Sequence, residues 1–144
     1  MANIQFNVAK GRINELAALA GASDSLIAVP LEATGIVSDA TMRDYATLAD
    51  ILAGASNEQT TMGRQTLTGV AVAVDQATDT QSTDSADITW AAATGNPIAA
   101  IVICYKPDSG SADSAIIPLT KHDYAATPDG SDIVATVANI FTAS

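Results

Sequence analysis

Two stretches of the chain alternate apolar and other residues with a period of two. Val70, Val72 and Val74 alternate with alanines, and Ile88 and Trp90 flank a threonine. Alternation places successive side chains on opposite faces of an extended backbone. Both stretches are therefore predicted to be strands with one buried face.

Other stretches are apolar almost without interruption. Residues 98–105 read IAAIVICY, which is typical of a central strand buried on both faces. Residues 26–31 (LIAVPL) predict a second buried strand, in which Pro30 is expected at an edge or a strand end because it has no N–H to donate. Residues 115–120 and 133–141 are predicted to be further strands.

One segment has helical spacing throughout. Apolar residues at three- and four-residue steps predict an α-helix over about residues 41–53. This stripe consists of Met42, Tyr45, Ala49 and Leu52. Ser38 or Asp39 is placed to cap its N-terminus, and Gly54 is placed to end it in a left-handed conformation.

The N-terminal region allows two interpretations. Ile13, Leu16, Ala17 and Ala20 fall at helical spacing within residues 11–22. An extended arm or first strand through Phe6 and Val8 fits equally well. We expect residues 1–12 to form an extended arm and leave residues 11–22 open between strand and helix.

Polar and turn-forming segments separate the predicted strands. Residues 75–87 predict a polar loop or a hairpin excursion, and residues 95–97, 107–114 and 126–131 predict turns. Several short strands with one early helix favour a mainly β fold, an antiparallel β-sandwich or barrel-like domain. We expect one domain over residues 1–144.

Composition narrows the classes of function. The chain has 144 residues with 6 Lys and Arg against 16 Asp and Glu, a formal net charge of −10. This charge argues against binding nucleic acid or an anionic membrane surface, which both require cations. Hydrophobic residues make up 48% but aromatic residues only 4%, so the core is expected to consist of small aliphatic side chains. Such a core has a thin stability margin that self-association would increase.

Residues with catalytic potential are few, and no enzyme is predicted. His122 lies beside Asp123, but adjacent strand residues point to opposite faces, so a hydrogen-bonding role is favoured over a catalytic pair. Cys104 lies in an apolar run and is expected to be a small buried residue. Trp90, in an alternating segment, is expected in the core.

Acidic residues gather in two predicted loops but lack the spacing of an EF-hand calcium loop. We interpret them as solvated surface groups and expect no metal or other cofactor. The residues concerned are Asp75, Asp79, Asp84, Asp87, Asp108 and Asp113.

Several segments, taken together in order, resemble a family of small virion proteins from tailed bacteriophages. They cover nearly the whole chain and comprise FNVAKGR (6–12), DATMRDYATLADILA (39–53), TGVAVAVD (68–75), TW (89–90), IVICYKPD (101–108), IIPLTKHD (116–123), TPDGSDI (127–133) and FTAS (141–144). The resemblance implies a capsid decoration (cement) protein that binds the outer surface of the major capsid protein lattice as a homo-oligomer, with a trimer favoured. A minor tail, neck or fibre-associated protein is the alternative. No catalytic residue is carried over from the resemblance.

Residues near the termini are the candidates for contacts with other chains. Phe6 and Phe141 are expected to anchor the ends to the body or to a neighbouring chain, and Val8 lies in the same arm as Phe6. Lys10 and Arg12 are two of six cations and are expected to pair with acidic groups of a partner. For a fibre-associated protein that binds host glycans, the candidate stacking residues are Tyr105 and Tyr124.

Overall fold

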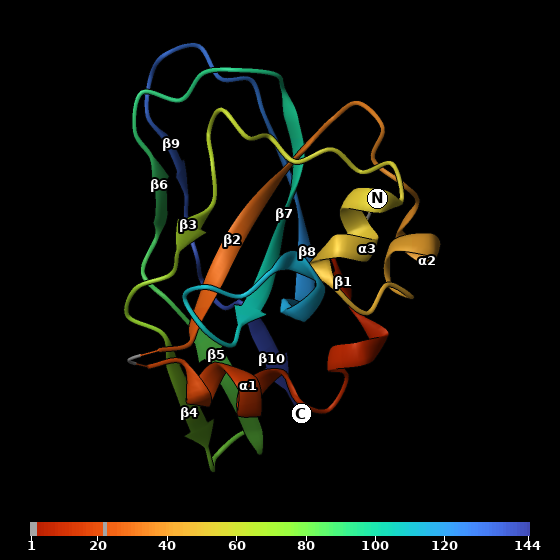
Figure 1. Ribbon diagram of the computed structural model, residues 1–144. Coiled ribbons are helices and arrows are strands. Elements are labelled where there is room, and N and C mark those ends of the chain that lie inside the picture. Colours follow the sequence, from red (N-terminus) through yellow and green to blue (C-terminus); the bar gives the residue numbers. More distant parts are fainter. Residues whose placement is uncertain (1–2, 22) are drawn as a thin grey trace.

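A computed structural model describes residues 3–21 and 23–144 of the protein. Within these residues the strands form three antiparallel sheets, which confirms the predicted mainly β antiparallel fold (Figure 1). The five-stranded sheet has the order β1 (Ile4–Gln5), β8 (Ile117–Ala126), β7 (Ile98–Lys106), β2 (Ser25–Glu32) and β3 (Gln65–Thr66). The three-stranded sheet has the order β10 (Phe141–Ala143), β5 (Thr80–Asp84) and β4 (Ala71–Asp75), and the two-stranded sheet pairs β6 (Ile88–Trp90) with β9 (Ile133–Ala135).

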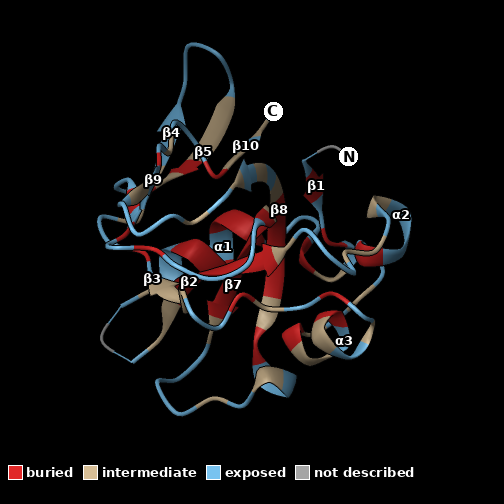
Figure 2. Cartoon of the chain, turned by 90° about the horizontal axis from the view of Figure 1, so that it is seen from above, coloured by how far each residue is buried: buried red, intermediate tan, exposed pale blue. Residues whose placement is uncertain are grey.

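Strand β7 lies between β8 and β2 and is covered on both faces. Ile101 and Ile103 belong to one buried cluster, whereas Val102 and Cys104 belong to the other. Figure 2 shows β2 and β7 buried along most of their length, whereas β8 is buried mainly in its first half. Burial on both faces explains why this strand reads as one continuous apolar run, and it confirms the predicted central strand.

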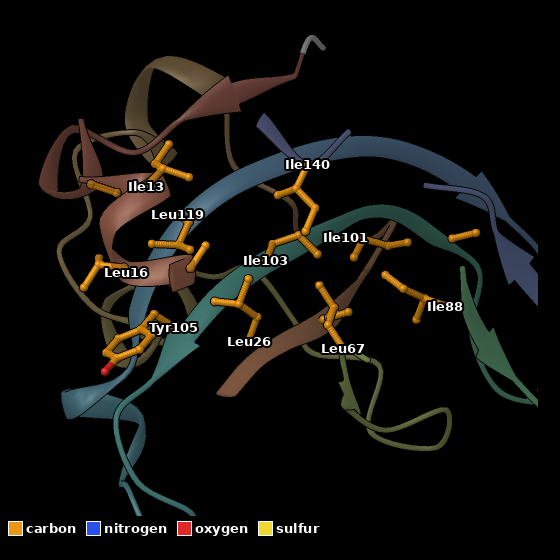
Figure 3. Packing of buried hydrophobic residues seen from close by; sticks show 14 of the residues in the cluster. Ile13, Leu16, Leu26, Leu67, Ile88, Ile101, Ile103, Tyr105, Leu119 and Ile140 are labelled. Atoms are coloured by element: carbon orange, nitrogen blue, oxygen red, sulfur yellow. The ribbon is translucent and has the colours of Figure 1, made fainter. Parts of the chain in front are cut away.

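The first face of the large sheet packs against helix α1 (Ile13–Leu19). Ile13 and Leu16 from α1 meet Leu119 from β8 and Leu26 from β2 (Figure 3). The same cluster includes Trp90, which is 1% exposed and confirms the predicted core position. Residues 13–19 are therefore helical, which decides the open question for most of residues 11–22.

The second face is covered by the N-terminal segment and two short helices. These are α2 (Asp39–Met42) and α3 (Leu48–Ala53). The short 3₁₀ turn η1 (Asn7–Ala9) contacts β8, and a second one, η2 (Asp113–Ala115), contacts α3. Phe6, Met42, Leu48 and Ile51 are fully buried against this face.

The prediction of one helix over residues 41–53 is wrong, because the first helix ends at Met42 and a second helix begins at Leu48. Thr47 is the N-cap of α3 and accepts the Asp50 N–H, while the Asp50 carboxylate accepts the Thr47 N–H. This reciprocal capping box starts a new helix at the point where a single helix would have continued. Leu48 and Ile51 then face the core, while three members of the predicted stripe, Tyr45, Ala49 and Leu52, are only half-buried.

Both predicted ends of that helix fall in the right place but differ in detail. Ser38 caps α2 by accepting the Thr41 N–H. Gly54 is the C-cap of α3 with a φ of −81°, so it is not left-handed, and the next residue, Ala55, takes the positive φ instead. A Cβ at position 54 would overlap the phenol ring of Tyr45, so a larger residue there would require this ring to move.

Residues 3–12 do not form the predicted extended arm. Strand β1 pairs with β8, and the Phe6 N–H donates to the Leu119 carbonyl at 3.1 Å. The Asn7 N–H donates to the Arg43 carbonyl at 2.8 Å. Because Phe6 fills a position in the second core cluster, the segment is part of this domain. Met1 and Ala2 lie outside the described residues.

Pro30 lies near the end of β2, as expected for a residue without an N–H. Its carbonyl accepts from the Gln59 N–H at 2.9 Å, so on this side β2 is flanked by an irregular segment and an isolated bridge rather than by β3. The missing N–H therefore interrupts no regular ladder.

Two further predictions have opposite outcomes. Residues 75–87 contain the turn and second strand of the β4–β5 hairpin, so the hairpin alternative holds. Residues 133–141 are not one strand, because β9 and β10 belong to different sheets. The Val137 N–H donates to the Asp87 carboxylate and the Ile140 N–H to the Thr83 carbonyl, which fixes the crossing between the sheets.

Candidate functional site

The five residues predicted to contact other chains have different environments. Phe6 is 0% exposed because its ring fills the core, so of its two expected roles it anchors the N-terminal segment to the body of the domain and does not serve as an interface residue. Val8 is half-buried and packs against both core clusters. Lys10 and Arg12 are exposed, and Arg12 lies 3.9 Å from the Glu15 carboxylate. Phe141 is half-buried in β10.

Lys10 and Phe141 line the same open cleft, although 131 positions separate them in sequence. The cleft has a volume of about 490 Å³ and lies where the N-terminal segment, β8 and the start of β10 meet. It is lined by Asn3, Ile4, Gln5, Lys10, Arg43, Thr120, His122, Asn139, Ile140, Phe141 and Thr142. The structure thus brings together two of the five predicted residues, one from each end of the chain.

Positive charge at this cleft contrasts with the rest of the protein. Lys10 and Arg43 are both exposed and are two of six cations in a chain of net charge −10. Amide and hydroxyl groups of Asn3, Asn139 and Thr120 add hydrogen-bonding capacity. Such a lining is suited to carboxylate groups, which accept hydrogen bonds and pair with both kinds of cation.

His122 contributes to the cleft from β8. Its Nε2 lies 2.9 Å from the Thr120 hydroxyl, two residues away on the same face of the strand. Burial lowers the pKa of the His122 imidazole, and the neighbouring Lys121 charge lowers it further, while Asp123 opposes the shift. The ring is therefore held in its neutral form at pH 7, available to donate or accept one hydrogen bond.

Asp123 does not orient His122. Its carboxylate lies 2.6 Å from the Lys121 Nζ on the opposite face of β8. This confirms that adjacent positions of the strand keep the imidazole and the carboxylate apart.

Lys121 anchors the strand below the cleft. Its side chain is 0% exposed, and its Nζ lies 2.6 Å from the carboxylates of both Asp39 and Asp123. A buried ammonium group is tolerated when charged partners satisfy it. The Asp39 pair joins β8 to the first turn of α2, and the Asp123 pair lies within β8. The strand that carries His122 is therefore fixed to the helices that cover the second face of the sheet.

A second charged network lies at the far end of the large sheet. The Arg64 guanidinium donates to both Glu58 oxygens and both Asp113 oxygens, at 2.7–3.1 Å. Hydrogen bonds from Arg64 lower the pKa of Asp113 and raise the pKa of Arg64 itself. Cys104 is fully buried, and burial raises the pKa of its thiol, which confirms its predicted role as a small core residue.

The aromatic residues considered for glycan stacking are not equally accessible. Tyr105 is 8% exposed, and its hydroxyl donates a hydrogen bond to Asp24 at 2.8 Å. The prediction that its ring could stack on a glycan is therefore wrong. Tyr124 is half-buried and donates to the Val134 carbonyl.

Carboxylates in the acidic segments bond to nearby backbone. Asp75 accepts the Ala77 N–H, Asp84 accepts the Ser85 N–H and Asp87 accepts the Val137 N–H. Among residues 3–21 and 23–144, no group of three or more His, Cys, Asp or Glu side chains is placed to hold a metal ion. In the same part of the chain, no helix has the length and apolar character needed to span a membrane.

Sequence reasoning missed six polar residues of the cleft, which are Asn3, Gln5, Arg43, Thr120, Asn139 and Thr142. Arg43 reaches the cleft because the Asn7 N–H bonds its carbonyl, a contact across 36 positions that no local pattern encodes. Lys121 was also missed, but it had a signal: a lysine directly after a buried strand segment, with an aspartate two residues later on the same face.

Comparison with protein-family models, with curated proteins and with solved structures finds no match to this chain.

The Lys121 ion pairs give a test of how β8 is held. Replacing both Asp39 and Asp123 by Asn leaves a buried ammonium without a charged partner, and we expect a loss of about 3–5 kcal/mol in the free energy of unfolding. Each single replacement costs less, because one carboxylate remains. Urea unfolding followed by Trp90 fluorescence measures these differences. Lys121→Met is the comparison and costs less than the double replacement, because both carboxylates retain contact with water; an equal cost would contradict this account.

His122 gives a pH-dependent test. Its folded-state pKa is below the ordinary value of about 6.5, so the unfolded chain binds a proton first as the pH falls. The free energy of unfolding should therefore decrease from pH 7.0 to pH 5.5. His122 is the sole histidine in the sequence, so urea unfolding of His122→Gln should show little change over the same interval. An equal slope in both proteins would contradict the prediction.

Proposed function

We propose that this protein is a structural component of a tailed-bacteriophage virion, a decoration protein that binds the outer surface of the major capsid protein lattice and stabilises it. The ordered sequence resemblance across residues 6–144 supports this class of protein. The structural observation that carries the proposal is the cleft of Lys10, Arg43 and His122 on an otherwise acidic chain.

The charge distribution supports a surface contact with an acidic partner segment. A net charge of −10 keeps free copies soluble and apart, and it disfavours contact with packaged DNA. The exposed Lys10 and Arg43 can pair with carboxylates of the capsid surface, while the amides of Asn3 and Asn139 fix the register of a bound segment.

Because capsid sites repeat on the lattice, several weak contacts made by one oligomer would together be sufficient for stable binding. A homo-oligomer, with a trimer as the state that the resemblance implies, engages several equivalent capsid sites at once. Each further contact then forms at a high effective concentration, so the assembly binds more tightly than one copy does.

Copy number per virion tests the proposal directly. Quantitative mass spectrometry against the major capsid protein should give a ratio near one copy per capsid subunit, or a simple lattice fraction of it. A handful to a few dozen copies would instead support the alternative of a tail, neck or fibre-associated protein. Absence from purified virions would contradict any virion role.

The cleft can be tested by charge reversal. Lys10→Glu combined with Arg43→Glu should weaken binding to capsids lacking the protein by at least about tenfold, because attractive contacts become repulsive. Co-sedimentation with such capsids measures the loss. Lys106→Glu, which changes a cation outside the cleft, should leave binding within about twofold. Deleting residues 1–12 is a poorer test, since it removes the buried Phe6 ring.

Unchanged binding by the double variant, with near-UV circular dichroism showing an intact fold, would remove the cleft from the proposal. The copy-number result would still stand independently.

A further inference from the structure

Strand β4 has one side without a strand partner. It is the last strand in the order β10-β5-β4, and β5 occupies its other side. Val74 is 61% exposed, and β4 is exposed along most of its length (Figure 2). An exposed apolar edge strand is a template for pairing with another strand.

The backbone groups of the valines point to this open side. The Thr83 carbonyl accepts the Ile140 N–H, so Thr83 directs its backbone groups toward β10. In an antiparallel ladder this direction alternates, so Ser82 and Asp84 bond toward β4, opposite Ala73 and Ala71. The N–H and C=O groups of Val72 and Val74 therefore point away from β5. Among residues 3–21 and 23–144, no backbone hydrogen bond outside the regular strands involves either valine.

The sequence of this edge is a palindrome. Residues 70–74 read VAVAV, which is identical in both directions about Val72. Two copies of a strand related by a two-fold axis run antiparallel, so residue 70 of one faces residue 74 of the other. We propose that β4 pairs with β4 of a second copy of this chain across a two-fold axis at Val72, joining the two three-stranded sheets into one six-stranded sheet.

This register satisfies the open backbone groups without a charge penalty. Val72 pairs with itself and Val70 pairs with Val74 in hydrogen-bonded positions, while Ala71 faces Ala73 in the closer, non-hydrogen-bonded positions. Asp75 of each copy lies opposite Gly69 of the other, so no two carboxylates face each other.

The same register covers exposed apolar side chains on the helical face. Helix α1 crosses the small sheet toward β4 (Figure 1), and the residue after it, Ala20, lines a surface hollow with Gly69 and Val70. Because Val70 of one copy lies opposite Val74 of the other, the end of α1 approaches Val74 across the axis. Leu19, the last residue of α1, is 53% exposed, and Val74 is 61% exposed. Pairing sets Val74 of each copy against Val70 of the other, and burial of these apolar side chains favours a second copy as the occupant.

A disulfide mixture tests the register. Ala71→Cys and Ala73→Cys are prepared as separate proteins, and Cys104 does not compete because it is fully buried. Under mild oxidation the mixture should give a disulfide-linked heterodimer, since residues 71 and 73 of different copies are predicted to lie about 4.5 Å apart at Cα. Each protein alone should give several-fold less dimer. Non-reducing electrophoresis measures the products.

A matched pair of lysine variants tests the surface without cysteines. Val74→Lys places a charge on the edge, whereas Val134→Lys places the same charge on β9, at a residue 47% exposed. By sedimentation velocity the parent protein should show concentration-dependent association of 14.6 kDa chains in pairs. Val74→Lys should lose this pairing step, and Val134→Lys should keep it. Circular dichroism checks that both variants are folded.

Three results would overturn the proposal: no association at millimolar concentration, equal loss in both lysine variants, or equal crosslinking in the single-cysteine samples and the mixture. None of these depends on the proposed place in the virion. A protein absent from virions can still pair through β4, and a decoration protein can bind its lattice without this contact.

Discussion

The need to cover both faces of β7 determines most of this structure. The strand is nine residues long and almost entirely apolar, so water must be excluded above and below it. Because only 4% of the residues are aromatic, a few large side chains cannot cover the strand, and several short elements cover it together. Helix α1 and the small sheets cover one face, while α2, α3 and the segment around Phe6 cover the other. The N-terminal segment is therefore a structural layer of the domain.

Buried polar groups tie these thin layers together. Lys121 bonds β8 to α2, Arg64 bonds the loop before β3 to η2, and Asn14 bonds α1 to β5, accepting the Thr83 hydroxyl at 2.6 Å. Among the described residues, no buried side-chain nitrogen or oxygen lacks a hydrogen-bond partner. Each such group would be costly if left alone, so the networks select one arrangement of layers that small aliphatic contacts alone would specify weakly.

The sequence predicted those features that local pattern controls. The continuous apolar run of residues 98–105 predicted burial on both faces of this strand. The burial of Cys104 was predicted from the same run, and that of Trp90 from the alternating pattern around it. The predicted helix over residues 41–53 failed because Thr47 and Asp50 form a capping box inside an apolar stripe, and a cap overrides periodicity. The cleft itself was not predicted. Lys10 and Phe141 were singled out, but their meeting with Arg43 depends on backbone contacts across the whole chain, which no local pattern records.

The small sheet places the two proposed contacts on opposite sides. The cleft adjoins β10, and the open edge belongs to β4, with β5 between them. One copy can therefore engage a partner surface at the cleft and a second copy at the edge without either excluding the other. Neither contact needs to be strong, because simultaneous engagement raises the effective concentration of the remaining one. On the proposed capsid lattice, this division would also offset the repulsion between copies of net charge −10, because contacts already made at the cleft would hold the β4 edges close together.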